Sequence, residues 1–143
     1  MVINKDYVEK ENADCKTKHR NTIQRVKILK FLKNSKNHPN AETIYKAVSK
    51  DIPTITLATV YRNLKILKER GEIIILEINK EYRYDASTGS HIHCICKNCG
   101  KIIDVMDDKI INYAMKNLKA KDFIPKETKI MFKGICKECA DKN

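Results

Sequence analysis

Residues 56–86 read "TLATVYRNLKILKERGEIIILEINKEYRYDA", and this stretch carries the patterns of one helix followed by two strands. Thr56 is a suitable N-cap and Gly71 a suitable C-cap for the helix. Apolar residues recur between them at helical spacing, namely Leu57, Val60, Leu64 and Leu67. The runs "EIIILEI" and "EYRYDA" then flank Asn79 and Lys80, which predicts a β-hairpin.

Two more amphipathic segments precede this stretch. Residues 22–35 place Ile23, Val26, Leu29 and Leu32 on one predicted helical face, and residues 40–50 open on Asn40, a good N-cap. Three short helices followed by a hairpin are typical of a winged helix-turn-helix, whose third helix enters the DNA major groove. The residues that this arrangement presents to DNA are Thr56, Ala58, Thr59, Tyr61, Arg62 and Lys65.

The charge distribution favours a polyanionic partner. The formal net charge is +11, and the segment between Cys15 and Ala41 contains eight lysines and arginines and no acidic residue. We expect phosphate contacts from three of these cations, namely Lys18, Arg20 and Arg25. The alternatives are a generally lysine-rich composition and the ordinary polar outer face of an amphipathic helix.

Composition predicts a soluble cytoplasmic protein. No apolar run is long enough to span a membrane, and the polar N-terminus does not resemble a signal peptide. The six cysteines are then expected to be metal ligands or free thiols. The pattern changes near residue 86, so we predict a DNA-binding domain at 1–85 and a second, α+β domain at 86–143.

Two CxxC pairs are the strongest local signal in the second domain. Each two-residue spacer allows both thiolates to reach one ion, and two such pairs close a tetrahedral sulfur shell around structural zinc. The ligands are Cys96, Cys99, Cys136 and Cys139. Two redox-active CxxC motifs are the alternative. Cys94 is expected to be a small buried apolar residue and Cys15 a free thiol.

A second candidate site lies beside the first CxxC pair. His91 and His93 are two residues apart in a predicted strand and therefore point to the same face. Asp104 lies on the neighbouring predicted strand and Asp85 at the end of the hairpin. If these groups converge, their nitrogen and oxygen ligands suit Fe(II) or Mn(II), with zinc as a competitor. A surface histidine pair with two solvated acids is the alternative.

Five segments in this order resemble the ferric uptake regulator (Fur) superfamily of bacterial metal-dependent repressors. They are "HPNAETIYKAV", "TLATVYRNLK", "YRYD", "HIHCICKNCGKIIDV" and "GICKECA". The resemblance implies an N-terminal winged-helix domain, a small α/β dimerisation domain with a four-cysteine zinc site, and a homodimer that binds a double-stranded operator with two-fold half-sites. It also assigns His38 to a regulatory Fe(II) or Mn(II) site with Asp85, His91, His93 and Asp104.

The resemblance is closest to the peroxide-responsive repressor (PerR) branch, because aspartate rather than glutamate stands at position 104. It implies that peroxide oxidises a ligand histidine, His38 or His91, when iron is bound. Within the superfamily, a repressor that senses the supply of iron, zinc or manganese is the alternative. The alternatives outside the superfamily are a zinc hydrolase and a zinc-stabilised protein-interaction module. We expect no enzyme, because no general base or nucleophile accompanies the ligands.

Overall fold

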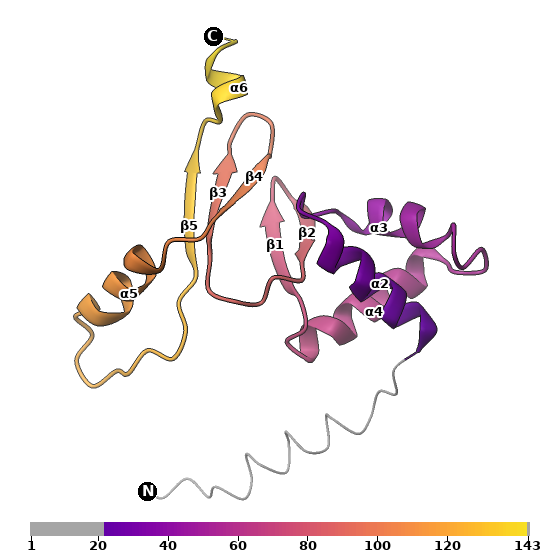
Figure 1. The fold of residues 1–143 in the computed structure, drawn as a ribbon, viewed down its shortest axis with the longest axis horizontal. Helices are drawn as coiled ribbons and strands as arrows, with labels where there is room; N and C mark the ends of the chain where they lie inside the picture. Colours follow the sequence, from indigo (N-terminus) through magenta and orange to yellow (C-terminus); the bar gives the residue numbers. More distant parts are fainter. Residues whose placement is uncertain (1–21, 143) are drawn as a thin grey trace, which may run out of the picture. The chain divides into compact units, whose positions relative to one another are not determined.

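The computed structural model describes residues 22–142, and Figure 1 shows their helices and strands. The predicted phosphate contacts Lys18 and Arg20, together with Cys15, lie outside the described residues. The described chain divides into two compact units. The first contains residues 22–76 and 82–87, and the second contains residues 77–81 and 88–142.

The first unit contains three helices, which are α2 (Ile23–Asn34), α3 (Ala41–Val48) and α4 (Leu57–Glu69). Each begins after a polar residue whose side chain accepts a hydrogen bond from a backbone N–H three residues later. These N-caps are Thr22, Asn40 and Thr56. Gly71 follows α4 with a φ of 68°, the left-handed conformation that favours glycine after a helix. The predicted start of α4 is thus confirmed, and its C-cap is Arg70, one residue before the predicted Gly71.

The three helices share one apolar core. Its most completely buried side chains, each exposed by 1% or less, are Ile28, Ile44, Val60, Leu64 and Leu67. Two residues of the following hairpin region also belong to this core. Ile73 lies just before the first strand, and Tyr84 lies within the second. The core holds α4 so that its opposite face, which includes Tyr61 and Arg62, is exposed.

The buried face of α2 differs from the predicted one. Ile23 and Val26 are 75% and 53% exposed, whereas Arg25, Ile28 and Leu32 are buried. A pattern based on polarity assigns arginine to the surface, yet its long aliphatic stem can be buried against a core. Arg25 is only 5% exposed, which argues against a phosphate contact, although its predicted contact stays a prediction. Desolvation, followed by repulsion from Arg70, lowers the pKa of Arg25, and Glu72 partly offsets this.

The predicted hairpin is confirmed. Strands β1 (Ile74–Ile78) and β2 (Glu81–Asp85) form a two-stranded sheet. Asn79 and Lys80 connect them with φ values of 53° and 65°. Two successive left-handed residues are characteristic of the type I′ turn, whose twist matches that of paired strands. The turn fixes the register of β2, which carries Arg83 and Asp85.

Truncation of a core residue tests this packing. Leu64→Ala is expected to lower the free energy of unfolding by about 2–5 kcal/mol, because it leaves a cavity at a side chain that is 1% exposed. Lys68→Ala changes an exposed position of the same helix and serves as the control. Chemical denaturation of both variants measures the difference, and equal stabilities would contradict the assigned core.

The second unit contains the three-stranded sheet β4-β3-β5. Its strands are β3 (Ile92–Cys96), β4 (Ile102–Val105) and β5 (Ile130–Gly134). Strand β3 is antiparallel to β4 and parallel to β5. The long connection that a parallel pair requires contains α5 (Asp108–Asn117), and α6 (Lys137–Ala140) follows β5.

Much apolar surface of the second unit is exposed. Within α5 only Ile111 is buried, while Ile110 on the helix and Leu118 just after it are 42% and 52% exposed. Phe132 on β5 and Ile103 on β4 are also exposed. Exposed apolar surface of this extent is characteristic of an interaction site. Among residues 22–142, no helix combines the length and apolar character that a membrane crossing requires.

Candidate metal centres

The four predicted zinc ligands come together in the second unit. The sulfur atoms of Cys96, Cys99, Cys136 and Cys139 all lie within 4.8 Å of one another. Sulfurs arranged tetrahedrally about 2.3 Å from zinc would be about 3.8 Å apart. The distance between the sulfurs of Cys99 and Cys136 is 3.7 Å. This group therefore fits a closed four-thiolate zinc site.

Pairing between β3 and β5 brings the two CxxC motifs together. Cys96 ends β3 and is in register with Gly134 at the end of β5. The backbone N–H of Lys97 donates to the carbonyl of Gly134 at 2.8 Å. Because the strands are parallel, the motif that follows each strand lies at the same edge of the sheet. Cys136 is then the N-cap of α6, which carries Cys139.

The backbone around this group favours a thiolate. The N–H of Cys136 donates to the sulfur of Cys96 at 3.3 Å. This bond and others from nearby backbone N–H groups lower the pKa of Cys96 to about 6. The thiol of Cys139, by contrast, shares hydrogen bonds with Cys136 and Cys99, which raise its pKa to about 12. The group thus has one ready anionic ligand, and a bound cation would favour ionisation of the others.

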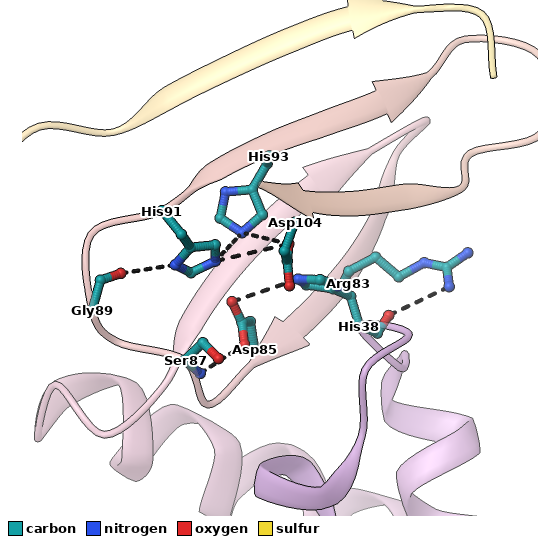
Figure 2. A network of polar contacts seen from close by, with 8 residues as sticks. All are labelled: His38, Arg83, Asp85, Ser87, Gly89, His91, His93 and Asp104. Carbon is teal, nitrogen blue, oxygen red and sulfur yellow. Dashed lines mark hydrogen bonds and ion pairs between the residues drawn. The ribbon is translucent and has the colours of Figure 1, made fainter. Parts of the chain in front are cut away.

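The second unit also places His91, His93 and Asp104 together, as Figure 2 shows. The Nε2 atoms of the two histidines are 2.9 Å apart. Two nitrogens bound at right angles to one ion at about 2.1 Å would be about 3.0 Å apart. Asp104 Oδ1 lies 3.8 Å from His91 Nε2 and 3.7 Å from His93 Nε2. The three side chains thus have the spacing of ligands for one cation.

Strand pairing and a loop carbonyl orient these ligands. His93 and Asp104 are direct partners on β3 and β4, while His91 immediately precedes β3. Nδ1–H of His91 donates to the carbonyl of Gly89 at 2.8 Å, since a carbonyl can only accept. In the neutral ring, Nε2 of His91 is then unprotonated and available to a metal. The predicted common face of His91 and His93 is confirmed.

The first unit contributes a separate pair of buried groups. His38 Nε2 lies 3.5 Å from Asp85 Oδ2, and their side chains are 2% and 7% exposed. The other oxygen of Asp85 accepts the N–H of Ser87 at 2.7 Å. A buried imidazole beside a buried carboxylate offers a nitrogen and an oxygen that suit a divalent metal ion. The residue pattern alone did not identify His38, because its loop context is equally typical of a helix cap.

The other predicted DNA-binding residues in the described chain lie on α4 or cap its start. Thr56, Ala58, Tyr61, Arg62 and Lys65 are exposed, and Thr59 is half-buried. The hydroxyls of Thr56 and Thr59 are 2.9 Å apart, and Thr56 also accepts the N–H of Thr59. Thr56 therefore caps the helix, while Tyr61, Arg62 and Lys65 present their side chains to solvent.

Comparison with known proteins identifies the family. Residues 16–133 match the ferric uptake regulator family. The chain is 38% identical to the peroxide-responsive repressor PerR of Staphylococcus saprophyticus, over 94% of this chain and 95% of that protein. The structure is similar to the Campylobacter jejuni peroxide stress regulator, with a TM-score of 0.73 and 29% identity over 96% and 100% of the two chains.

A second structural relative is reported to have metal-binding sites. The Helicobacter pylori ferric uptake regulator, described as having three functional metal-binding sites, gives a TM-score of 0.70. The two chains are 30% identical, over 93% of this chain and 91% of that one. Together with the arrangement of the cysteine, histidine and aspartate groups, these matches show that the chain belongs to the ferric uptake regulator family.

Proposed function

We propose that this protein is a metal-dependent transcriptional repressor that senses hydrogen peroxide through iron-catalysed oxidation of a ligand histidine. The observation that carries the proposal is the facing pair of His91 and His93 with Asp104 beside both. Similarity to a peroxide-responsive repressor over most of the chain supports it. A repressor that responds to the supply of iron, zinc or manganese is the second candidate, because it would need the same nitrogen and oxygen ligands.

The regulatory ion in this proposal is held by five residues, namely His38, Asp85, His91, His93 and Asp104. These three nitrogens and two oxygens would suit Fe(II) or Mn(II), and a sixth ligand such as peroxide could then be accepted. Fe(II) held by these residues would supply the one-electron chemistry that turns peroxide into an oxidant, and Mn(II) there would not. In the net reaction, peroxide would leave one oxygen atom on the histidine and the other in water. The four cysteines hold structural zinc, so the thiolates are not the primary target of peroxide.

Metal binding in this proposal couples the two parts of the chain. His38 and Asp85 belong to the first unit, and His91, His93 and Asp104 belong to the second. One ion bound by both sets would favour the arrangement of the domains that binds DNA. Oxidation of His38 or His91 would remove a ligand and release that arrangement. We assign the DNA-binding domain to residues 1–85 and the dimerisation domain to residues 86–143.

The DNA-binding surface is proposed to be a winged helix. Helix α4 is the reading helix and the β1-β2 hairpin is the wing, with Lys18 and Arg20 as phosphate contacts. A second copy of the chain covers the exposed apolar residues of α5 and β5, and the dimer reads an operator with two-fold half-sites. The family consists of regulators, so no catalytic residue is assigned, and a DNA-binding repressor of this kind would act in the cytoplasm.

Arg62→Ala tests the reading helix. Arg62 is exposed on α4, and loss of a direct base contact is expected to weaken operator binding by about 1–3 kcal/mol and relax specificity at one base pair. Lys46→Ala removes one exposed positive charge from α3 and is the matched control. Fluorescence anisotropy with the manganese-loaded protein measures both. Wild-type affinity in Arg62→Ala would remove this residue from the interface.

Metal dependence tests the proposed function directly. The zinc-containing protein without a regulatory ion should bind operator DNA weakly, and either Fe(II) or Mn(II) should strengthen binding. Brief peroxide treatment should then release DNA from the iron form only. If peroxide released DNA from neither the iron nor the manganese form, the metal-supply repressor would be favoured. Operator binding of equal strength with and without the regulatory metal would contradict both candidates.

A further inference from the structure

The backbone of His38 adopts a conformation that needs external support. Its φ is 45°, in the left-handed region that residues with a Cβ adopt only at some cost. Pro39 follows and further restricts the conformations of the residue before it. Such strained residues persist only where their surroundings hold them, and they are concentrated at functional sites. The contacts around His38 therefore determine where its ring points.

Strand β2 supplies those contacts on consecutive residues. Nη1 of Arg83 donates to the carbonyl of His38 at 3.5 Å, and the N–H of Tyr84 donates to the carbonyl of Pro39 at 3.0 Å. The next residue along the chain, Asn40, is fixed as the N-cap of α3. The loop that carries His38 is thus held by β2 on one side and by a helix start on the other.

Arg83 and Asp85 hold opposite ends of His38. They are two residues apart on β2, so their side chains extend from the same face of the strand. Arg83 contacts the backbone carbonyl of His38, while Asp85 Oδ2 lies 3.5 Å from ring atom Nε2. Figure 2 shows both side chains reaching toward His38 from the hairpin. The contact from Arg83 to the carbonyl of His38 therefore acts on the backbone whose conformation sets the direction of the imidazole ring.

We infer that Arg83 is a positioning residue, which presents His38 to the regulatory metal by holding its backbone carbonyl. The inference rests on the proposed function, because it assigns Arg83 a role in the same metal site. Removal of a group that orients a metal ligand commonly weakens metal binding by about 10–100-fold. The guanidinium does not contact the metal in this role.

The direction of the change in Mn(II) affinity distinguishes a positioning role of Arg83 from a purely electrostatic one. A positive guanidinium near a cation site repels the cation, so a purely electrostatic role predicts that Arg83→Gln binds Mn(II) more tightly. Loss of positioning predicts weaker binding, by about tenfold or more. Arg83→Lys keeps the charge but replaces the planar donor with a point charge, and it should recover only part of the affinity.

The metal-free protein provides a second and independent measurement. The N–H of Tyr84 donates to the carbonyl of Pro39, in the loop that Arg83 holds. Arg83→Gln should therefore speed hydrogen exchange at Tyr84 by about tenfold, while core amides of α4 stay protected. Lys46→Gln removes a charge from an exposed position of α3 and should change neither Tyr84 exchange nor Mn(II) affinity. In the iron form treated with peroxide, Arg83→Gln should shift oxidation from the peptide with His38 to the peptide with His91.

The outcomes separate this inference from the proposed function. Weaker Mn(II) binding with selectively faster Tyr84 exchange supports the positioning role. Unchanged exchange with equal or tighter Mn(II) binding overturns it, and so does faster exchange throughout the helices, which would indicate general destabilisation. Absence of any metal-dependent DNA binding in the wild-type protein would instead contradict the proposed function.

Discussion

Cys96→Ser is expected to lose one zinc ion per chain and, with it, the folded second unit. Cys96 closes the four-sulfur group and accepts the N–H of Cys136, so the substitution removes both a ligand and a contact between β3 and the segment after β5. Structural zinc contributes about 10–16 kcal/mol in small zinc-binding peptides. That contribution is as large as the whole stability of a typical domain, which is about 5–15 kcal/mol. Elemental analysis, circular dichroism and size-exclusion chromatography measure zinc, folding and dimerisation.

Cys94→Ser is the matched control for this experiment. Cys94 lies two residues earlier on the same strand and is half-buried, but it is not a member of the four-sulfur group. This variant should retain zinc and remain folded. A Cys96→Ser protein that stays a stable dimer without zinc and binds DNA normally would contradict a structural zinc site.

Peroxide is expected to modify the iron-loaded protein at a histidine and to release it from DNA. A peptide that contains His38 or His91 should gain the mass of one oxygen atom, because these ligands would lie beside the ion at which peroxide is reduced. Nδ1–H of His91 donates a hydrogen bond to the carbonyl of Gly89, and this bond orients the ring so that Nε2 faces His93. Mass spectrometry of the digested protein and anisotropy on the same sample measure oxidation and release together.

Two comparisons make the peroxide experiment specific. The manganese-loaded protein should bind DNA but show neither oxidation nor release. Asp104→Glu should keep metal-dependent binding and blunt the response, since a longer carboxylate can chelate the ion and occupy the position that peroxide needs. Unmodified histidines together with oxidised Cys96 or Cys99 would indicate a thiol-based switch instead.

Local features of this protein were determined by the sequence itself. Asn40 and Thr56 cap helices because a short polar side chain can satisfy the backbone N–H groups that begin a helix. Asn79 and Lys80 form the turn between two β-rich runs. The common face of His91 and His93 follows from the two-residue period of a strand, and the CxxC spacing predicted the four-sulfur group. The caps, the turn and the strand face depend on neighbours within a few residues along the chain, whereas pairing of β3 with β5 was needed to bring the two CxxC pairs together.

Tertiary packing decided what depends on residues far apart in the sequence. The face of α2 that is buried follows from contact with α3 and α4, and it includes Arg25, whose charge had indicated an exposed position. His38 came from the family resemblance and not from its own context, because no local pattern places a loop histidine beside Asp85. Its left-handed backbone and its contacts with Arg83 and Asp85 arise only when β2 packs against the loop before α3. Polarity along one helix does not determine which of its faces is buried, because that depends on the shape and contacts of the helices packed against it.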